Sequence, residues 1–247
     1  SDILRKNKIE KLIIIDKQKR CKGLITVTDI EKSEKYPQAT KDNIGRLRVA
    51  AAIGVGKDGL YRAERLVESG VDALVLDTAH AHSERVINTI KDLKKKFKDR
   101  VQIIAGNIAT SEAAAELIKY PINGIKVGIG PGSICTTRLV AGIGVPQLSA
   151  ILSVTKAFKN NKTKIISDGG IKYSGDLAKA LAAGADAIMI GSLFAGTMET
   201  PGKLIKKNGK LFKSFRGMGS VGAMNKGSAD RYFQNKQRDK SKYVPEG

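Results

Sequence analysis

The sequence has few cysteines, no tryptophan and no long hydrophobic run. Its two cysteines, Cys21 and Cys135, lie far apart among 247 residues and in dissimilar contexts. We therefore expect no disulfide scaffold. A reducing, cytoplasmic compartment is expected instead, where any functional cysteine acts as a free thiol. A membrane helix needs roughly 18 consecutive apolar residues, and no run approaches that length. The charged N-terminal stretch also lacks the pattern of a signal peptide, so we expect no membrane partner.

Acidic residues are scarce relative to basic ones. The chain carries 44 Lys and Arg against 24 Asp and Glu, a formal net charge of +20. Such a charge can bind nucleic acid by releasing counterions. The lysines, however, are spread over separate clusters without interleaved aromatic residues, at 94–96, 206–207 and 236–242. We therefore favour a solvated Lys-rich surface and do not expect nucleic acid as a specific partner.

The sequence does contain a regular alternation of apolar runs and amphipathic stretches, in a composition that is 41% hydrophobic. Runs rich in Val, Ile, Leu and Ala predict strands buried on both faces, as in parallel sheets. These runs are 48–54, 72–80, 101–110, 124–130, 164–170 and 187–192. Amphipathic stretches between them predict helices, as at 83–98 and at 111–119, where Ser111 is placed as the N-cap. Gly70 and Gly184 are placed to end helices in a left-handed conformation.

Polar and glycine residues follow most of the predicted strands. They are Asp77, Asn107, 128–133, 168–170 and 191–192. Alternating strands and helices indicate a doubly wound sheet or a β/α barrel. Polar groups gathered after the strands favour the barrel, whose sites lie at the carboxyl ends of its strands. The predicted fold is an α/β protein, a TIM (β/α)8 barrel that is incomplete, with about six strand–helix units.

Three local patterns carry other interpretations. Residues 54–59 read G-x-G-x-x-G between a predicted strand and helix, with Asp77 ending the next strand, which is the context of a Rossmann fingerprint. The polar clusters after the other strands argue against it. His80 and His82 have the spacing of metal ligands, but no carboxylate or cysteine cluster accompanies them, so we expect packing histidines. Residues 8–32 have a strand–turn–strand pattern.

The segment 128–138, GIGPGSICTTR, combines a flexible glycine-rich backbone with a thiol and two threonine hydroxyls. Such a backbone can bind phosphate through N–H groups or a monovalent cation through carbonyls. A nucleophilic cysteine needs an exposed site that favours the thiolate. Chemistry alone leaves Cys135 open between a nucleophile and a packing residue.

This segment and several others, in order, resemble the inosine-5′-monophosphate (IMP) dehydrogenase family. The further motifs are VAGIGVPQ at 140–147, SDGGIKYSG at 167–175, GSLFAG at 191–196, RGMGS at 216–220 and DRYF at 230–233. The resemblance extends with short gaps from about 45 to 247. It implies the C-terminal part of a CBS domain at 1–35, the barrel at 36–198 and a catalytic flap region at 199–247. Residues 220–247 are polar, rich in glycine and lysine and without strong periodicity, so we expect them to form a mobile flap or lid.

The family oxidises IMP to XMP with NAD as the hydride acceptor, in the synthesis of GMP and other guanine nucleotides. The resemblance therefore implies an NAD-dependent oxidoreductase with IMP and NAD as partners, NAD and a potassium ion as cofactors, and a homotetramer. The family's first two barrel strands and its C-terminal segment have no counterpart here, so the chain is expected to be a fragment.

Four residues match the family's catalytic groups. Cys135 matches the nucleophile that adds to C2 of the purine, and Thr137 matches the threonine near the hydrolytic water. Arg231 and Tyr232 match the flap pair that activates this water, with Arg231 as the proposed base. Because a guanidinium normally stays protonated, this role requires an unusual environment. Without the resemblance, a surface Arg-Tyr pair would be the preferred interpretation.

Further matches concern the ligands. The IMP phosphate is assigned to Ser133, Gly170, Gly191 and Ser192, its ribose to Asp168, and its base to Met218, Gly219 and Glu246. NAD is assigned to Asp77, at the nicotinamide ribose, and to Asn107. Part of a potassium site is assigned to the carbonyls of Gly130, Gly132 and Cys135. Gly23, Thr26 and Asp29 resemble a CBS nucleotide motif, but half a module is expected to bind nothing.

Two alternatives and one departure remain. A GMP reductase shares the barrel and the cysteine loop but lacks the water-activating flap, so Arg231 and Tyr232 argue against it. A catalytically silent nucleotide- or nucleic-acid-binding protein is the other alternative, motivated by the charge. Phe215 stands where the family usually has Tyr, whose hydroxyl helps to hold the phosphate. We therefore expect weaker IMP binding.

Overall fold

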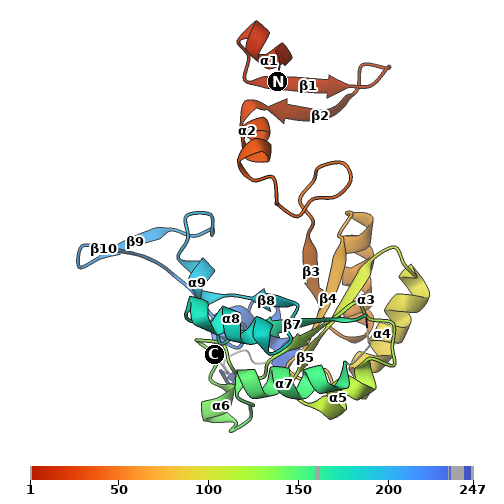
Figure 1. Ribbon diagram of the computed structural model, residues 1–247, viewed down its shortest axis with the longest axis vertical. Helices are drawn as coiled ribbons and strands as arrows, with labels where there is room; N and C mark the ends of the chain where they lie inside the picture. The colour runs from red at the N-terminus through yellow and green to blue at the C-terminus, as the bar shows by residue number, and fades with distance from the viewer. Residues whose placement is uncertain (1, 159–161, 233, 235–241, 246–247) are drawn as a thin grey trace. The chain divides into compact units, whose positions relative to one another are not determined.

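The computed structural model describes residues 2–158, 162–232, 234 and 242–245 (Figure 1). Its contacts divide the chain into two compact units, Ser1–Arg48 and Val49–Gly247. This division groups residues 36–48 with the N-terminal unit, whereas the sequence motifs place them in the barrel. The functional boundaries at 35/36 and 198/199 stay predictions. No helix among the described residues has the length and apolar character to cross a bilayer.

The N-terminal unit contains a two-stranded antiparallel hairpin between two helices. The helix α1 (Asp2–Asn7) precedes β1 (Lys11–Ile15) and β2 (Cys21–Thr26), and α2 (Val27–Lys35) follows. The predicted strand–turn–strand pattern is therefore present, but the second strand ends at Thr26. Its hydroxyl accepts the Asp29 amide at 3.1 Å, and the Asp29 carboxylate accepts the Thr26 amide at 3.0 Å, a capping box that starts the helix there.

The second unit is built on a curled parallel sheet whose strands follow one another in sequence order (Figure 1). The strands are β3 (Ala50–Ile53), β4 (Ala73–Asp77), β5 (Gln102–Ile108), β6 (Gly124–Val127), β7 (Lys164–Asp168) and β8 (Ala187–Met189). All lie within the predicted apolar runs. A Rossmann sheet reverses its strand order at a switch point, so this topology confirms the partial barrel.

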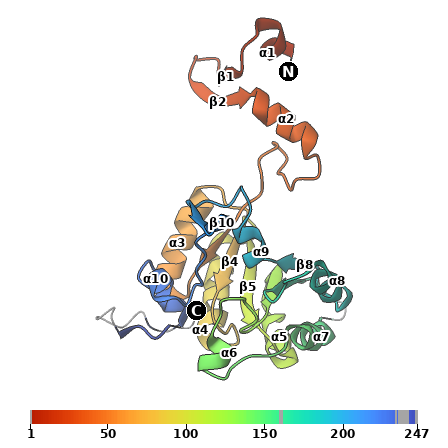
Figure 2. The ribbon, with the colours of Figure 1, turned by 90° about the vertical axis from the view of Figure 1, so that its left-hand side faces the viewer.

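The two faces of the sheet differ: one is mainly apolar, and the concave one carries apolar residues such as Val75 and Ile104 together with charged residues. Helices α3 (Gly56–Glu68), α4 (Glu84–Phe97), α5 (Ser111–Leu117), α7 (Gln147–Ala157) and α8 (Ser174–Ala182) cover the apolar one (Figure 2). On that face Leu74, Leu76, Ile103 and Ile125 are each at most 1% exposed. Their alternate neighbours point to the opposite face, which carries Asp77 and Lys126. The core therefore lies between sheet and helices, and charges collect on the concave side.

Glycine explains two of the sequence signals. Gly70 and Gly184, after α3 and α8, have φ of 84° and 105°, which confirms the predicted left-handed helix ends. Gly59 lies in the first turn of α3, where a Cβ atom would come within 2.1 Å of the Gly54 carbonyl oxygen. The G-x-G-x-x-G spacing therefore allows α3 to pack closely on the end of β3.

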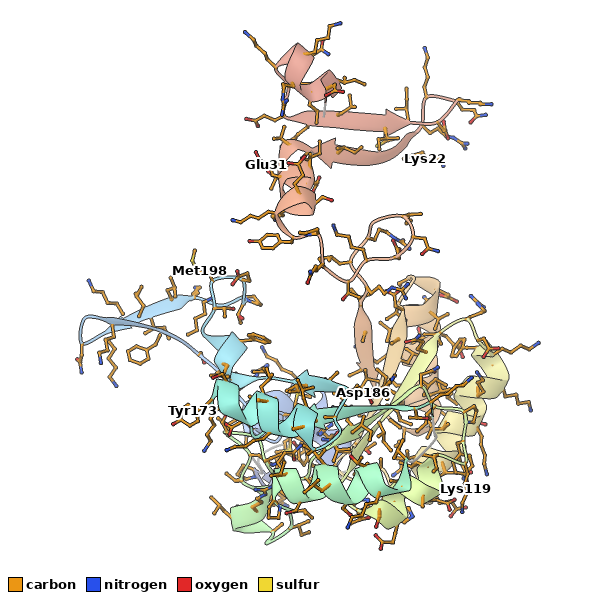
Figure 3. The ribbon with its side chains drawn as sticks, in the orientation of Figure 1. Lys22, Glu31, Lys119, Tyr173, Asp186 and Met198 are labelled. Atoms are coloured by element: carbon orange, nitrogen blue, oxygen red, sulfur yellow. The ribbon has the colours of Figure 1, made fainter. Side chains whose placement is uncertain are left out.

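The segment after β8 contains α9 (Ser192–Ala195), a hairpin of β9 (Leu204–Lys207) and β10 (Lys210–Lys213), α10 (Val221–Met224) and a short 3₁₀ helix (Ser228–Tyr232). The Lys213 ammonium holds the base of the hairpin, donating to the carbonyls of Thr197 at 2.6 Å and Thr200 at 2.5 Å. In the intervening loop, Met198 is 96% exposed (Figure 3). The catalytic flap region at 199–247 and the mobile flap at 220–247 stay predictions.

One helix cap differs from the sequence-based expectation. Thr110, not Ser111, is the N-cap of α5, and its hydroxyl accepts the Ala113 amide at 3.2 Å. Ser111 is the first helical residue, and its hydroxyl lies 3.2 Å from the carboxylate of the neighbouring exposed Glu112. Both residues are helix-capping types in adjacent positions, so sequence could not decide between them.

The substitution Thr110→Ala tests this cap. We expect it to lower the free energy of unfolding by about 1 kcal/mol, because one amide in the first turn loses its acceptor. The matched variant Ser111→Ala should change stability by less than about 0.5 kcal/mol. Urea unfolding followed by circular dichroism measures both. Equal losses, or a larger loss in S111A, would contradict the assignment.

Candidate active site

A cavity of about 410 Å³ opens at the carboxyl ends of β5 to β8. Its walls are the loops after β6, β7 and β8, together with residues 215–219 and the 3₁₀ helix. Predicted site residues on these walls are Asn107, Gly130, Gly132, Ser133, Cys135, Asp168, Gly170, Gly191, Ser192, Met218, Gly219, Arg231 and Tyr232. The structure thus brings together side chains spread over more than half of the chain.

Three predicted residues need separate mention. Thr137 begins the short helix α6 (Thr137–Val140) and contacts Cys135 behind the cavity wall. Asp77 ends β4 and reaches the site through Arg231 and Lys126. Glu246 lies outside the described residues, so its assignment to the purine base stays a prediction.

The cysteine loop is held in place by glycines that allow close backbone approach. At Gly128, with φ of 146°, a Cβ atom would lie 2.3 Å from the carbonyl oxygen of Asp168. The loop therefore lies directly on the end of β7. At Gly170, with φ of 79°, a Cβ atom would lie 3.3 Å from Pro131 Cβ, so the two loops are packed together. Only glycine adopts these conformations without strain at such close contacts.

Cys135 is half-buried on the cavity wall. Its thiol donates to the Thr137 hydroxyl, with 3.3 Å between Sγ and Oγ1. Its amide donates to the Gly132 carbonyl at 3.1 Å, which closes a tight turn. A thiol that faces a cavity and has a hydroxyl beside it can act as a nucleophile on a bound ligand.

Phe215 also lines the cavity and is 46% exposed. A Cβ atom on Gly191 would lie 3.7 Å from its ring carbon Cζ. The para position, where a tyrosine carries its hydroxyl, therefore points at the loop to which the sequence motifs assign the phosphate. In this chain that wall of the cavity is apolar.

The charged centre of the site is Lys126, which sequence reasoning missed. Lys126 lies in the middle of β6 and is only 4% exposed. Its ammonium is 2.8 Å from Asp168 Oδ2 and 2.9 Å from Asp77 Oδ1. The Asn107 amide also donates to Asp168 Oδ2, at 2.9 Å, and to the Gly128 carbonyl at 2.7 Å. The available signal was a lysine inside an otherwise apolar strand, GIKV.

Arg231 completes this group by forming an ion pair with Asp77. Burial favours the neutral form of Asp77, but the charges of Arg231 and Lys126 outweigh it and lower the pKa of the carboxyl. Burial opposes the charge on Arg231 too, yet Asp77 outweighs it and raises the pKa of the guanidinium. In this arrangement the ion pair with Asp77 holds Arg231 as a cation, and its assignment as the base stays a prediction. Its guanidinium also lies 6.0 Å from the Tyr232 ring centroid.

The two histidines lie close together in the loop between β4 and α4. His80 and His82 stack with ring centroids 6.3 Å apart, and the His82 amide donates to His80 Nδ1 at 3.2 Å. Burial, and then the charge of His82, lower the pKa of His80. Within the described part of the chain, no group of three metal-ligating side chains exists.

Comparison with known proteins gives a consistent result. Residues 12–247 match the family model described as "IMP dehydrogenase / GMP reductase domain". The chain is 58% identical to an inosine-5′-monophosphate dehydrogenase of Rhizobium tropici, covering 99% of this chain and 49% of that protein. It is 56% identical to the enzyme of that name from Helicobacter pylori, covering 100% and 50%. The chain spans about half the length of the curated relatives it matches.

Among solved structures, the chain is similar to a GMP reductase variant from Trypanosoma brucei in complex with guanosine 5′-monophosphate. The TM-score is 0.83 at 46% sequence identity, over 100% of this chain and 50% of that one. This likeness supports the half-barrel fold.

The ion pairs of Asp77 predict an acid-dependent stability. Because its folded pKa is depressed, its contribution is present above the unfolded value of 3.8 and is lost as the pH falls below it. We expect Asp77→Asn to be less stable than wild type near pH 5, with a gap that narrows toward about pH 3. Urea unfolding at several pH values measures this gap.

The control is Asp99→Asn, which removes a carboxylate that is 94% exposed and pairs with Lys94 at the surface. Because surface ion pairs contribute little to stability, the free energies of unfolding of D99N and wild type should differ by no more than about 1 kcal/mol. A D77N gap that is constant over the acid range would contradict the assigned charge pairing.

Proposed function

The chain belongs to the IMP dehydrogenase / GMP reductase family, and we propose that it oxidises IMP to XMP with NAD through a covalent intermediate on Cys135. The observation that carries the proposal is the half-buried Cys135 thiol on the wall of a nucleotide-sized cavity, 3.3 Å from Thr137. Ligand pockets commonly measure about 300–1,000 Å³. Relatives over 50% identical bear the name of this enzyme.

The cavity offers groups that suit each part of IMP. Glycine loops at 168–170 and 191–192 present backbone and the Ser192 hydroxyl to the phosphate, and Asp168 is an acceptor for ribose hydroxyls. The Cys135 sulfur, after its thiol proton is lost to solvent, adds to C2 of the purine. The C2–H bond then breaks as the hydride leaves, and water cleaves the C2–S bond to give XMP and the free thiol. The Thr137 hydroxyl, which accepts from the thiol here, orients the sulfur for attack.

NAD, when bound, supplies the acceptor for the hydride that leaves C2. Asp77 suits the assigned contact to the NAD ribose. Because its pKa is depressed, its carboxylate stays ionised and can accept a hydrogen bond from a ribose hydroxyl. The Arg231 guanidinium already pairs with this carboxylate. A ribose hydroxyl therefore has to share the carboxylate with the guanidinium or displace it. For Arg231 to accept a proton from water, it must also leave Asp77, whose charge holds it protonated.

Further parts of the proposal rest on the resemblance. The carbonyls of Gly130, Gly132 and Cys135 suit a potassium ion because they are hard oxygen donors, although the Gly132 carbonyl already accepts the Cys135 amide. We also propose a cytoplasmic homotetramer acting in GMP biosynthesis. In this scheme residues 1–35 are the C-terminal part of a CBS domain, 36–198 are the barrel and 199–247 are the catalytic flap region.

GMP reductase is the second candidate, because solved structures similar to this chain bear that name. It shares the barrel and the cysteine loop. The Arg231–Tyr232 pair at the cavity favours the dehydrogenase, since only the hydrolytic reaction needs an activated water. The two reactions differ in their nucleotide and in the direction of hydride transfer, so substrate pairs distinguish them.

Cys135→Ala tests the nucleophile. With IMP, NAD and potassium, we expect wild type to form XMP and NADH and the variant to lose at least about a thousandfold in rate, because the covalent step is removed. Cys21→Ala, which changes the exposed cysteine, is the control and should keep wild-type activity. Activity in C135A would rule out the covalent mechanism. Oxidation of NADPH with GMP, in place of the IMP reaction, would favour the reductase.

Phe215→Tyr tests the phosphate wall. The new hydroxyl should strengthen IMP binding by roughly tenfold. A hydrogen bond to a charged group contributes about 1.5–3 kcal/mol, and the lower end of this range is expected because the position is partly exposed. Inosine lacks the phosphate and should bind both forms equally. Isothermal titration with the two ligands measures the difference. An equal gain for inosine would show that the hydroxyl does not contact the phosphate.

A further inference from the structure

Lys126 lies behind the cavity wall and touches two of the carboxylates that the proposed function uses. Its side chain is 5% exposed, and its ammonium lies 2.9 Å from Asp77 and 2.8 Å from Asp168. Among the described residues, Lys126 does not line the cavity. It can therefore act on a ligand only through other side chains.

The register of the sheet puts Lys126 between these carboxylates. Asp77, Gly106 and Lys126 pair in one row across β4, β5 and β6, on the concave face. Gly106 leaves space for the lysine, because a Cβ atom there would lie 2.5 Å from Lys126 Cβ. Asp168, at the end of β7, is two residues beyond Ile166, the β7 partner of Lys126. The ammonium thus reaches both neighbours from a fixed position.

A buried ammonium needs charged partners, because desolvation otherwise favours its neutral form. Lys126 pairs with two carboxylates, and among the described residues Arg231 also contacts Asp77 and Asn107 also contacts Asp168. These five side chains form one continuous chain of polar contacts from the 3₁₀ helix to the end of β7. Lys126 is its central member and the only one in contact with both carboxylates among the described residues.

We propose that Lys126 is a positioning residue that orients Asp77 and Asp168 together, so that one side chain sets the affinity for both IMP and NAD. This inference rests on the proposed function, which assigns Asp168 to the IMP ribose and Asp77 to the nicotinamide ribose. A lysine with a merely structural role would affect stability and leave the two affinities of the folded protein unchanged.

The test substitutes Lys126→Gln, which keeps a polar side chain but removes the charge, and Lys126→Arg, which keeps the charge. The full chain is used, and the affinities for IMP and for NAD are measured separately by equilibrium dialysis. We expect K126Q to weaken the affinity for each ligand by about tenfold or more, because Asp77 and Asp168 each lose one charge-assisted hydrogen bond from Lys126. K126R should stay within about threefold of wild type for both ligands.

Lys164→Gln is the matched control. Lys164 lies on the adjacent strand β7 and also pairs with an aspartate at 2.9 Å, but its side chain is 68% exposed. Its partner Asp186 lies just before β8, away from the carboxyl ends of the strands (Figure 3). This variant should leave both affinities within about twofold, because surface ion pairs contribute little.

K126Q leaves two carboxylates without their shared cation, so circular dichroism and the urea midpoint check its fold. Should it not fold, K126Q/D168N removes one of the two charges and is compared with D168N alone. The NAD affinity then reports on Asp77, and the double variant should bind NAD about tenfold more weakly than D168N does.

The outcomes separate the two proposals. Loss of both affinities in K126Q with recovery in K126R supports the positioning role. Binding of both ligands by wild type, with no change or a change in only one in K126Q, overturns that role and leaves the proposed function intact. If wild type binds neither IMP nor NAD, the proposed function and this inference are both wrong.

Discussion

The register of the parallel sheet is the constraint on which the rest of the second unit depends. Because side chains alternate along each strand, one register sends Leu74, Leu76 and Ile125 into the helix layer and Asp77 and Lys126 to the concave face. A slip of one residue in β6 would bury the lysine among leucines and isoleucines, at a cost of several kcal/mol. The hydrophobic effect on one face therefore fixes the positions of the charges on the other.

Glycines, which have no side chain, are as important to the site as the residues whose side chains line it. Gly106 leaves the space that Lys126 fills, and Gly128 lets the cysteine loop rest on the end of β7. Each glycine costs conformational entropy on folding. The close approach at Gly128 brings the cysteine loop onto the end of β7, so that Cys135 and Asp168 line the same cavity.

The strands of the parallel sheet and several helices could be predicted from the sequence, and the family resemblance pointed to many of the residues that line the cavity. Runs such as 72–80 are nearly continuous in apolar residues, and that pattern belongs to buried parallel strands whatever the tertiary context. The end of β2 and the N-cap of α5 could not. At both places several adjacent residues are chemically suited to capping, and only the hydrogen bonds of Thr26 and Thr110 select one. Lys126 was missed because a charged residue in a strand normally faces solvent.

By itself, the sequence determined the half-barrel class and the motifs that identify the family. These properties are local: the period of apolar residues, the helix-ending glycines and the order of short segments such as GIGPGSICTTR are all read along the chain. Only the tertiary structure decided which charges meet. Asp77, Lys126, Asp168 and Arg231 come from separate segments, and their ion pairs depend on distances of a few ångströms and on burial. Such electrostatic energies vary steeply with distance and local dielectric, which no spacing along the sequence encodes.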